Sequence, residues 1–583
     1  MTDLTQAVHA VELIRARASQ RPEQDAIIRV RDARDRQDER LSYAELDRRA
    51  RAIADLLSGR CRPGSRILLL QPPVDFTTSF LGCLYAGMVA VPAPLPGRFR
   101  HERRRVRGIA EDAGISAVLT DPGHGAEVEE LVGELRLDGV EVLATDGADL
   151  PGDAWSAPAI GRDDLAMLQY TSGSTGDPKG VMVTHGNLLA NAAALAGGLG
   201  IAEGTRFGGW APQFHDMGLL AQTLPALFLG GSCALMTPTE FIKRPHQWLW
   251  MIDRYDIAWS PAPNFGYELC TRRAVDEELA GLDLSRWRYA VNGSEPVQVS
   301  TMEEFAERFA AHGFRAEAFS PCYGLAEATV YVSGVADRGP VAVRVDPDRL
   351  EQHEFVPVTE GGRRLVAHGP AADYEVRIAD PVTGAELPGG RIGEIWLRGN
   401  SVARGYWQRP DQTEATFRAG PGDGEFLRTG DLGTVHDGEL YLTGRRREVL
   451  IIRGRNLYPQ DLEQEMRLRH PELGSVGAAF AVPLTGGGGE HAVVLTHEVR
   501  PNLPEDVLRD LARRMKHEVA DEFGVSVGGI VLLARGGVRR TTSGKVQRAE
   551  MRSLFLAGDL VAQFADVDRR VPVAAVGQEG MSR

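Results

Sequence analysis

The sequence predicts an α/β protein with a large N-terminal part and a smaller α+β part at its C-terminal end. Short apolar runs alternate with helical patterns early in the chain, as in a sheet built from βαβ units. The pattern changes to short strands near residue 374 and restarts after residue 447. At 583 residues the chain is also too long for one ordinary core.

The N-terminal region shows the βαβ rhythm most clearly. Ser42 and Glu45 form a capping box, which predicts that a helix begins there. A strand is expected at Arg66–Leu70, a helix near 76–89, and another strand at Ala117–Thr120. These elements favour a mostly parallel sheet flanked by helices.

The short strands after residue 374 predict a β-rich unit that closes the large part. They lie at Tyr374–Ile378, Gly393–Leu397 and Gly438–Leu442, separated by turns rich in Gly, Pro and Asp. The connection from Val332 to residue 374 is long and shows no strong periodicity.

The C-terminal pattern alternates strand and helix again, which predicts a compact α+β module. Its expected elements are strands at 449–453 and 476–482 and helices from about 460 and at 505–522. We therefore assign residues 1–446 to an N-terminal domain, 447–570 to a C-terminal domain and 571–583 to a loose tail.

Composition excludes several classes of function. A formal charge of −14 argues against nucleic acid as a partner, because phosphate binding relies on a cationic surface. The apolar stretch Gly218–Met236 is interrupted by Gln222 and Pro225, so we interpret it as buried core and expect no stable membrane insertion. The start of the chain lacks the pattern of a signal peptide, and five scattered cysteines show no metal-ligand spacing. A reduced, cytoplasmic protein is expected.

The segment Tyr170–Gly180 carries the strongest chemical signal. Its glycines let backbone N–H groups approach an anion, its hydroxyls add donors, and its lysine is one of only four in the chain. It predicts a phosphate cradle, although its spacing is not that of a Walker loop and a flexible surface turn is the alternative. The candidate phosphate ligands are Thr171, Ser172, Gly173, Ser174, Thr175, Gly176 and Lys179.

Five further motifs follow in order along the chain. They are Asn292–Pro296, Tyr323–Glu327, Thr429–Asp431, Gly444–Arg445 and Thr541–Lys545. Any one of them alone would be an ordinary turn or surface segment. Together with the phosphate loop they resemble, over nearly the whole chain, the adenylate-forming enzymes: acyl-CoA synthetases, luciferases, adenylation domains and fatty acyl-AMP ligases.

The resemblance implies a role for each motif in binding ATP. Lys545 would be the catalytic lysine that bridges a substrate carboxylate and the α-phosphate. Glu327 would hold Mg²⁺ with help from Thr171, and both count as catalytic groups. Asp431 would bind the ribose hydroxyls, with Arg445 nearby. The remaining nucleotide contacts implied by the resemblance are Gly293, Ser294, Glu295, Pro296, Tyr323 and Gly324.

Two features depart from the family pattern. Arg539 and Arg540 stand where a proline often precedes the lysine loop. Arg447 stands at the implied hinge, a position that is commonly Asp or Lys in the family.

Three segments resemble the fatty acyl-AMP ligase branch in particular: Trp210–Gly218, Pro263–Cys270 and Pro321–Val332. The long connection at about 333–373 matches in place the insertion that distinguishes this branch and is thought to restrain the small domain. The implied substrate-binding residues are His215, Asp216, Met217 and Phe265.

The branch resemblance implies conversion of a fatty acid to acyl-AMP with ATP and Mg²⁺, followed by acyl transfer to the phosphopantetheine thiol of a carrier protein. No carrier segment follows the small domain, so a separate carrier chain or synthase carrier domain is expected. An acyl-CoA ligase is the alternative, and a catalytically silent carrier-binding module is a more distant one. Four arginines at 513, 514, 539 and 540 either dock the acidic carrier or belong to an ordinary arginine-rich surface.

Overall fold

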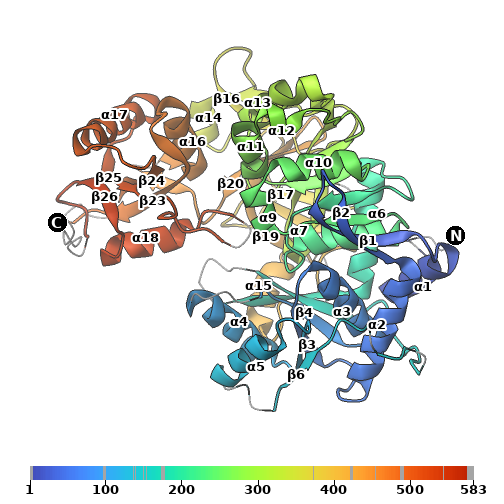
Figure 1. Ribbon diagram of the computed structural model, residues 1–583. Helices are drawn as coiled ribbons and strands as arrows, with labels where there is room; N and C mark the ends of the chain where they lie inside the picture. Colours follow the sequence, from blue (N-terminus) through green and yellow to red (C-terminus); the bar gives the residue numbers. More distant parts are fainter. Residues whose placement is uncertain are drawn as a thin grey trace.

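Two sheets with helices on their faces form most of the chain, and a smaller α+β part follows at the C-terminal end (Figure 1). The computed structural model describes residues 4, 6–95, 100–135, 137, 139–148, 150–152, 154–171, 178–371, 373–420, 425–452, 455–485, 491–541 and 544–573. The predicted α/β class is confirmed by the alternation of strands and helices.

The larger sheet has eight strands, whose inner six are parallel and whose two edge strands, β2 and β14, are antiparallel. In spatial order the strands are β14 (Tyr331–Gly334), β13 (Phe319–Gly324), β12 (Tyr289–Asn292), β11 (Trp259–Ala262), β9 (Phe207–Gly209), β10 (Cys233–Leu235), β1 (Asp25–Asp32) and β2 (Gln37–Ser42). Apart from β1, whose sequence includes four charged residues, the inner strands are mostly apolar and buried, as expected for a sheet covered on both faces.

The second sheet has six strands and ends in the hairpin that carries the phosphate loop. Its order is β6 (Glu141–Ala144), β5 (Ala117–Thr120), β3 (Arg66–Leu70), β4 (Val89–Pro92), β7 (Leu165–Thr171) and β8 (Lys179–Thr184). Only the last pair is antiparallel, with Thr171 opposite Lys179.

Helices cover both sheets and bury a continuous core between them. Those of the N-terminal part are α1 (Ala10–Gln20), α2 (Tyr43–Ser58), α3 (Pro73–Tyr85), α4 (Arg100–Ala113), α5 (Gly125–Glu134), α6 (His185–Leu199), α7 (Asp216–Gly218), α8 (Leu224–Phe228), α9 (Pro238–Lys243), α10 (His246–Arg254), α11 (Asn264–Arg273), α12 (Asp276–Leu279), α13 (Val299–Phe309), α14 (Pro347–Glu351) and α15 (Pro410–Phe417). A π-helix, η1 (Leu219–Thr223), joins α7 to α8.

Two local predictions can be compared with the helices. Helix α2 begins where the capping box predicts, because the Glu45 N–H donates to Ser42 Oγ over 3.3 Å. The helix predicted near 76–89 begins earlier and ends earlier. Pro73 occupies its first turn, and Gly87, with φ of +65°, lies just beyond its end.

The stretch from residue 218 to 236 is buried, as the sequence predicts, and forms η1, α8 and β10. Among the described residues, no helix combines the length and the apolar character needed to cross a bilayer.

The β-rich unit is a four-stranded antiparallel sheet. It consists of β17 (Glu375–Ala379), β18 (Gly393–Arg398), β19 (Leu427–His436) and β20 (Glu439–Arg445). The long connection before it is not featureless, because β15 (Ala342–Val345) pairs with β16 (Arg363–Val366) and α14 lies between them. The apolar residues of this connection pack with Tyr441 and Tyr458, contacts between distant segments that local periodicity does not reveal.

The C-terminal part has a four-stranded sheet of its own with helices packed against it (Figure 1). Its elements are β21 (Leu450–Ile452), β22 (Arg455–Leu457), α16 (Pro459–Arg469), β23 (Leu473–Pro483), β24 (His491–Val499), α17 (Glu505–Phe523), β25 (Val527–Leu533), α18 (Arg548–Ala557) and β26 (Ala562–Val567). The first strands and helices agree with the predicted positions within a few residues.

Candidate active site

One cavity of about 500 Å³ brings together most of the predicted site residues. It lies at the carboxyl ends of β11, β12 and β13, where ligands usually bind in open α/β sheets. The predicted residues that line it are Thr171, Lys179, His215, Asp216, Met217, Gly293, Ser294, Tyr323, Gly324, Glu327, Arg445, Arg447 and Lys545. Residues separated by hundreds of positions in sequence therefore share one enclosed space.

Asp431 forms the centre of a hydrogen-bonded group at one end of this cavity. Tyr323 Oη donates to Asp431 Oδ2 over 2.7 Å, and Arg445 Nε lies 3.0 Å from Asp431 Oδ1. The charge of Asp431 raises the pKa of Arg445, and burial together with Asp431 raises that of Tyr323. Each carboxylate oxygen keeps a lone pair for a further donor, as the predicted ribose contact requires.

Glu394 supports the turn that carries Asp431, and no sequence motif indicates this role. Its carboxylate accepts from the Gly430 N–H over 3.2 Å and from two nitrogens of Arg428 over 3.0 and 2.7 Å. Arg446 lies 3.8 Å from the same carboxylate. Glu394 is only 2% exposed, and such a buried carboxylate needs these partners. Glu394, Arg428 and Arg446 all line the cavity as well.

Glu327, the predicted metal ligand, is positioned by a tyrosine that sequence reasoning missed. Tyr406 Oη donates to Glu327 Oε1 over 2.8 Å, and the ammonium of Lys179 lies 5.2 Å from the centre of the Tyr406 ring. Burial, together with the charge of Glu327, raises the pKa of Tyr406. The tyrosine therefore stays protonated and donates to the carboxylate. It also links Glu327, the predicted metal ligand, to Lys179 of the phosphate loop.

The phosphate loop is described only at its two ends. Thr171 and Lys179 face each other across the β7–β8 hairpin and both line the cavity. The predicted ligands Ser172, Gly173, Ser174, Thr175 and Gly176 lie outside the described residues. Arg105 also lines the cavity, and burial lowers its pKa.

Lys545 enters the cavity from the C-terminal part. Burial and the charge of Arg445 lower the pKa of Lys545, and the carboxylates of Asp216, Asp431 and Glu295 oppose that change. The lysine is thus the cation among several carboxylates at the junction of the two parts. An ammonium in this position can neutralise a substrate carboxylate or a phosphate.

Thr541 and Lys545, the described ends of the lysine loop, contact each other although the proline that the family often has before the loop is missing. The Thr541 N–H donates to the Lys545 carbonyl over 2.8 Å, and the Lys545 N–H donates to Thr541 Oγ1 over 3.1 Å. Gly544 has φ of +86°, and a Cβ at this position would lie 2.8 Å from Phe265 Cε1. Glycine is therefore required here both by the backbone and by the neighbouring ring.

Phe265 lies against the lysine loop and is not among the described residues that line the cavity. Its ring is 5.4 Å from that of Trp210, which is buried against other aromatic rings. The structure thus places Phe265 where it can limit how far the lysine loop enters. Its role as a substrate contact stays a prediction.

His215 and Asp216, two predicted substrate-binding residues, line the cavity side by side. His215 Nδ1 is 2.6 Å from Asp216 Oδ1, and the Met217 N–H donates to the same oxygen over 2.7 Å. Burial raises the pKa of Asp216, but His215, Lys545 and the Met217 N–H outweigh it, and the pKa is lowered. Asp216 is therefore an anion that faces Lys545.

Glu295 and Pro296 lie next to the cavity but, in the described part of the chain, do not line it. Gly293 and Ser294, just before them in sequence, do line it. The Phe265 N–H donates to Glu295 Oε1 over 3.4 Å. Burial and the charge of Glu268 raise the pKa of Glu295 to about 7, although Lys545 opposes this change.

Part of the cavity lining is apolar, which the sequence motifs did not indicate. It is lined by Leu195, Leu199, Ala221, Trp259, Pro261, Val291, Cys322, Val330 and Tyr331. These residues come from helices and strands far apart in sequence, and they offer a surface suited to a hydrocarbon chain.

Ion pairs connect the C-terminal part to the remainder of the chain. Arg467 Nη1 of α16 lies 2.9 Å from each carboxylate oxygen of Glu268 in α11, and Arg467 Nη2 donates to Gln298 Oε1 over 2.7 Å. Arg455 pairs with Glu351 over 2.6 Å. The connection 333–373 supplies Glu351, so it contacts the C-terminal part directly.

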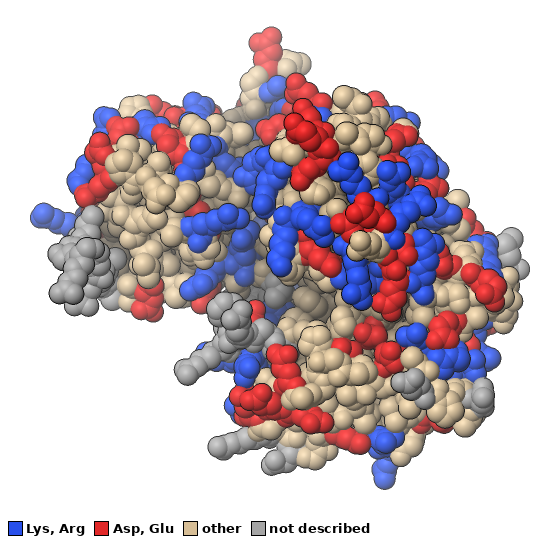
Figure 2. All heavy atoms as spheres, viewed as in Figure 1, with Lys and Arg blue, Asp and Glu red and all other residues tan. Residues whose placement is uncertain are grey.

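A second ion pair of that connection joins Arg363 to Asp461 over 2.5 Å. Arg447, the predicted hinge residue, follows β20 and lines the cavity. Basic and acidic side chains are interleaved over the face shown in Figure 2, with basic ones gathered where the C-terminal part meets the remainder.

Comparison with known proteins agrees with this geometry. Residues 14–407 match the family model described as AMP-binding enzyme. The chain is 40% identical over 539 residues to the medium-chain-fatty-acid–[acyl-carrier-protein] ligase JamA of Moorena producens, covering 89% of this chain and 90% of JamA. It is 32% identical to the ligase of the same description, TtuA, of Teredinibacter turnerae, covering 88% of each chain.

A solved structure of similar fold is the crystal structure of a fatty acid AMP ligase from Legionella pneumophila. It has a TM-score of 0.74 and 34% sequence identity, and the match covers 97% of this chain and 98% of that one. The family match spans more than half of the chain, and the relatives are similar over nearly all of it. The chain therefore belongs to the AMP-binding enzymes, and within them to the fatty acyl-AMP ligases.

Proposed function

We propose that this chain activates a medium-chain fatty acid by joining it to the AMP of ATP, and then passes the acyl group to the phosphopantetheine thiol of an acyl carrier protein. One observation carries the proposal. A single cavity is lined by Tyr323 and Arg445, which are the two partners of Asp431, by Lys545, and by a set of apolar side chains. Medium chain length is taken from the names of JamA and TtuA.

The chemistry follows from the charges in the cavity. An oxygen of the substrate carboxylate attacks the α-phosphorus of ATP, a new O–P bond forms, and the bond from the α-phosphorus to the leaving pyrophosphate breaks. Both reactants are anions, so the enzyme must position them and neutralise their charge. Lys545 lines the cavity and is placed for that task, and the charge of Asp216 favours its protonated form.

Glu327 and Thr171 fit a magnesium ion, which prefers oxygen ligands and keeps several waters beside one or two carboxylates. Glu327 Oε1 accepts from Tyr406, which leaves Oε2 available. When bound, Mg²⁺ screens the phosphate charges. Tyr406 fixes the carboxylate in one orientation, and Lys179 faces the same space from the phosphate loop.

Transfer to the carrier requires the small domain to move. We assign residues 1–446 and 447–570 to the two domains and Arg447 to the hinge between them, about which Lys545 withdraws. Two of the four arginines considered for carrier docking are neutralised by neighbouring carboxylates. Arg513 and Arg514 both pair with Asp510, and Arg514 also pairs with Glu472.

Arg539 and Arg540 are exposed, and their side chains have no partner among the described residues. They lie beside the lysine loop, and their positive charge suits the docking of an acidic carrier protein. We place both this enzyme and the carrier in the cytoplasm. Replacing both with Glu is expected to raise the KM for the carrier and to leave acyl-AMP formation unchanged.

The proposal is tested by incubating the enzyme with ATP, Mg²⁺ and straight-chain acids of four to sixteen carbons, with pyrophosphate and acyl-AMP both measured. Medium-chain acids should give both products, and an added carrier protein should accept the acyl group. Acyl-AMP from none of the acids would overturn the proposal. Rapid transfer to free coenzyme A, with none to the carrier, would favour an acyl-CoA ligase.

A further inference from the structure

Helix α4 packs against the hairpin that carries the phosphate loop. Asp112 Oδ2 accepts from Tyr170 Oη of β7 over 2.7 Å. One turn earlier in the helix, a Cβ on Gly108 would lie 3.3 Å from Cγ of Pro178, which directly precedes Lys179 of β8. The helix therefore contacts the chain on both sides of the phosphate loop.

Arg105 lies on the same face of this helix. It precedes Gly108 by three residues and Asp112 by seven, and residues at this spacing share one face of an α-helix. In the described part of the chain it is also the one residue of α4 that lines the active-site cavity, together with Thr171 and Lys179. The face that packs against the hairpin thus brings a guanidinium to the phosphate-loop side of the cavity.

Three other arginines that line the cavity are held by carboxylates near the predicted ribose contact. Arg445 pairs with Asp431, and both Arg428 and Arg446 lie within ion-pair distance of Glu394. Their charges balance these two carboxylates before a nucleotide binds. The phosphates of ATP therefore need cations from another side of the cavity.

The pyrophosphate group gains charge during the reaction. As a carboxylate oxygen bonds to the α-phosphorus, the bond from that phosphorus to the bridging oxygen breaks, and its electron pair stays on the departing pyrophosphate. A guanidinium offers a planar fork of N–H donors that fits phosphate oxygens, whereas the ammonium of Lys179 acts as a point charge. The Arg105 side chain is partly buried, and burial lowers its pKa. A cation that is partly removed from water attracts a neighbouring anion more strongly.

We propose that Arg105 binds the pyrophosphate part of ATP and stabilises it as it leaves. The phosphate site then extends beyond the glycine-containing loop to a helix that no sequence motif marks. The role of Arg105 is confined to formation of acyl-AMP, because pyrophosphate has left before the acyl group is transferred. This inference rests on the proposed function, because it assigns a catalytic residue to the same adenylation step.

The test separates the pyrophosphate site from the AMP site. In Arg105→Ala, kcat/KM for ATP in the formation of decanoyl-AMP should fall by about 10²–10³-fold. The inhibition constant of pyrophosphate should rise about ten- to hundredfold, the usual effect of losing a hydrogen bond to a charged group. Binding of AMP, and transfer of the acyl group from supplied decanoyl-AMP to the carrier protein, should remain as in the wild type. Arg105→Lys keeps the charge without the fork and should show a smaller loss.

Arg107→Ala is the matched control on the same helix. Arg107 is exposed, pairs with Glu111 over 2.7 Å and does not line the cavity in the described part of the chain. Its kcat/KM for ATP and its inhibition by pyrophosphate should equal those of the wild type.

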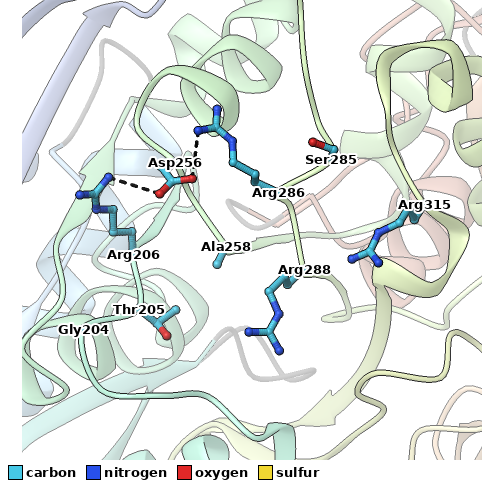
Figure 3. Close-up of a pocket in the computed structure, with 9 residues that line it drawn as sticks. All are labelled: Gly204, Thr205, Arg206, Asp256, Ala258, Ser285, Arg286, Arg288 and Arg315. Atoms are coloured by element: carbon cyan, nitrogen blue, oxygen red, sulfur yellow. Dashed lines mark ion pairs between the residues drawn. The ribbon is translucent and has the colours of Figure 1, made fainter.

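A second control addresses binding of pyrophosphate elsewhere on the surface. Figure 3 shows a separate hollow of about 700 Å³ in which Arg206 and Arg286 converge on Asp256, over 3.5 and 3.3 Å, and which Arg288 also lines. Arg288→Ala removes a cation from this hollow and should leave the inhibition constant unchanged. A raised constant in Arg288→Ala, with an unchanged one in Arg105→Ala, would overturn the inference.

Two further results would overturn it. One is unchanged inhibition by pyrophosphate in both Arg105 variants. The other is an equal loss of AMP binding, acyl transfer and pyrophosphate inhibition, which would mean that Arg105 only supports the packing of α4. Arg105→Lys keeps the test valid if Arg105→Ala does not fold. Absence of acyl-AMP from the wild type with every acid would count against the proposed function itself.

Discussion

The ion pair between Arg467 and Glu268 is expected to hold the catalytic lysine in the active site. It joins α16 of the C-terminal part to α11, and Glu268 also accepts from Thr301 Oγ1 over 3.0 Å. The same helix α11 begins beside Phe265, which packs against the lysine loop. Replacing Arg467 with Ala should therefore weaken the arrangement that brings Lys545 into the cavity.

The magnitude follows from burial. The side chains of Arg467 and Glu268 are 22% and 11% exposed, and the contact is bidentate. An exposed pair contributes up to about 1 kcal/mol, whereas breaking a fully buried one costs about 3–5 kcal/mol. An intermediate loss of about 2 kcal/mol corresponds to a fall of about 30-fold in the equilibrium constant for insertion of the lysine.

Single-turnover formation of acyl-AMP measures this equilibrium directly. Arg467→Ala should slow it by up to about 30-fold with ATP affinity nearly unchanged, and the exchanged pair Arg467→Glu with Glu268→Arg should recover most of the rate. Arg469→Ala is the control, because Arg469 lies on the same helix and pairs with Glu465 and Glu518 inside the C-terminal part. A normal rate in Arg467→Ala, or no recovery in the exchanged pair, would show that the contact does not govern insertion of the lysine.

Three other variants test individual roles. Lys545→Ala should lower acyl-AMP formation by about 10²–10³-fold with ATP binding preserved, and isothermal titration of ATP would reveal any loss of binding instead. Tyr406→Phe removes the hydrogen bond that orients the Glu327 carboxylate and should raise the Mg²⁺ concentration needed for half-maximal rate. A magnesium titration would detect this change, and an unchanged Mg²⁺ requirement would contradict the positioning role of Tyr406. The pKa of Glu295 is about 7 in the folded protein, against an ordinary 4.5. Protonated Glu295 therefore stabilises the folded state below pH 4.5, and this contribution is lost as the pH rises through 7. Glu295→Gln should therefore unfold at a higher temperature than the wild type at pH 8 and show a smaller difference at pH 5, and equal differences at both values would refute the shifted pKa.

The motifs predictable from sequence are those whose chemistry is local. The capping box at Ser42 acts within one helical turn, and the glycine at 544 is required by its own backbone conformation. Thr171 and Lys179 frame one hairpin, so a short segment holds both ends of the predicted phosphate cradle. Such features leave their whole pattern in a few adjacent residues.

The residues that sequence reasoning missed act across long separations. Tyr406 reaches Glu327 over 79 positions, and Glu394 supports a turn 36 positions away. Trp259 lies in an ordinary apolar strand, and only the pairing of β11 with its neighbours brings it into the lining of the cavity. Nothing in the composition of these strands distinguishes a cavity-lining residue from any other buried aromatic.

The balance of charge around Lys545 indicates when the lysine can leave. In the substrate-free cavity its ammonium is repelled by Arg445 and attracted by Asp216, Asp431 and Glu295. ATP and the acid add negative charge, which strengthens the attraction while both are bound. Departure of pyrophosphate removes most of that charge, whereas the Arg467–Glu268 pair lies outside the cavity and is unaffected. We therefore expect the ion pair, rather than the active-site charges, to set the rate at which the lysine withdraws after acyl-AMP has formed.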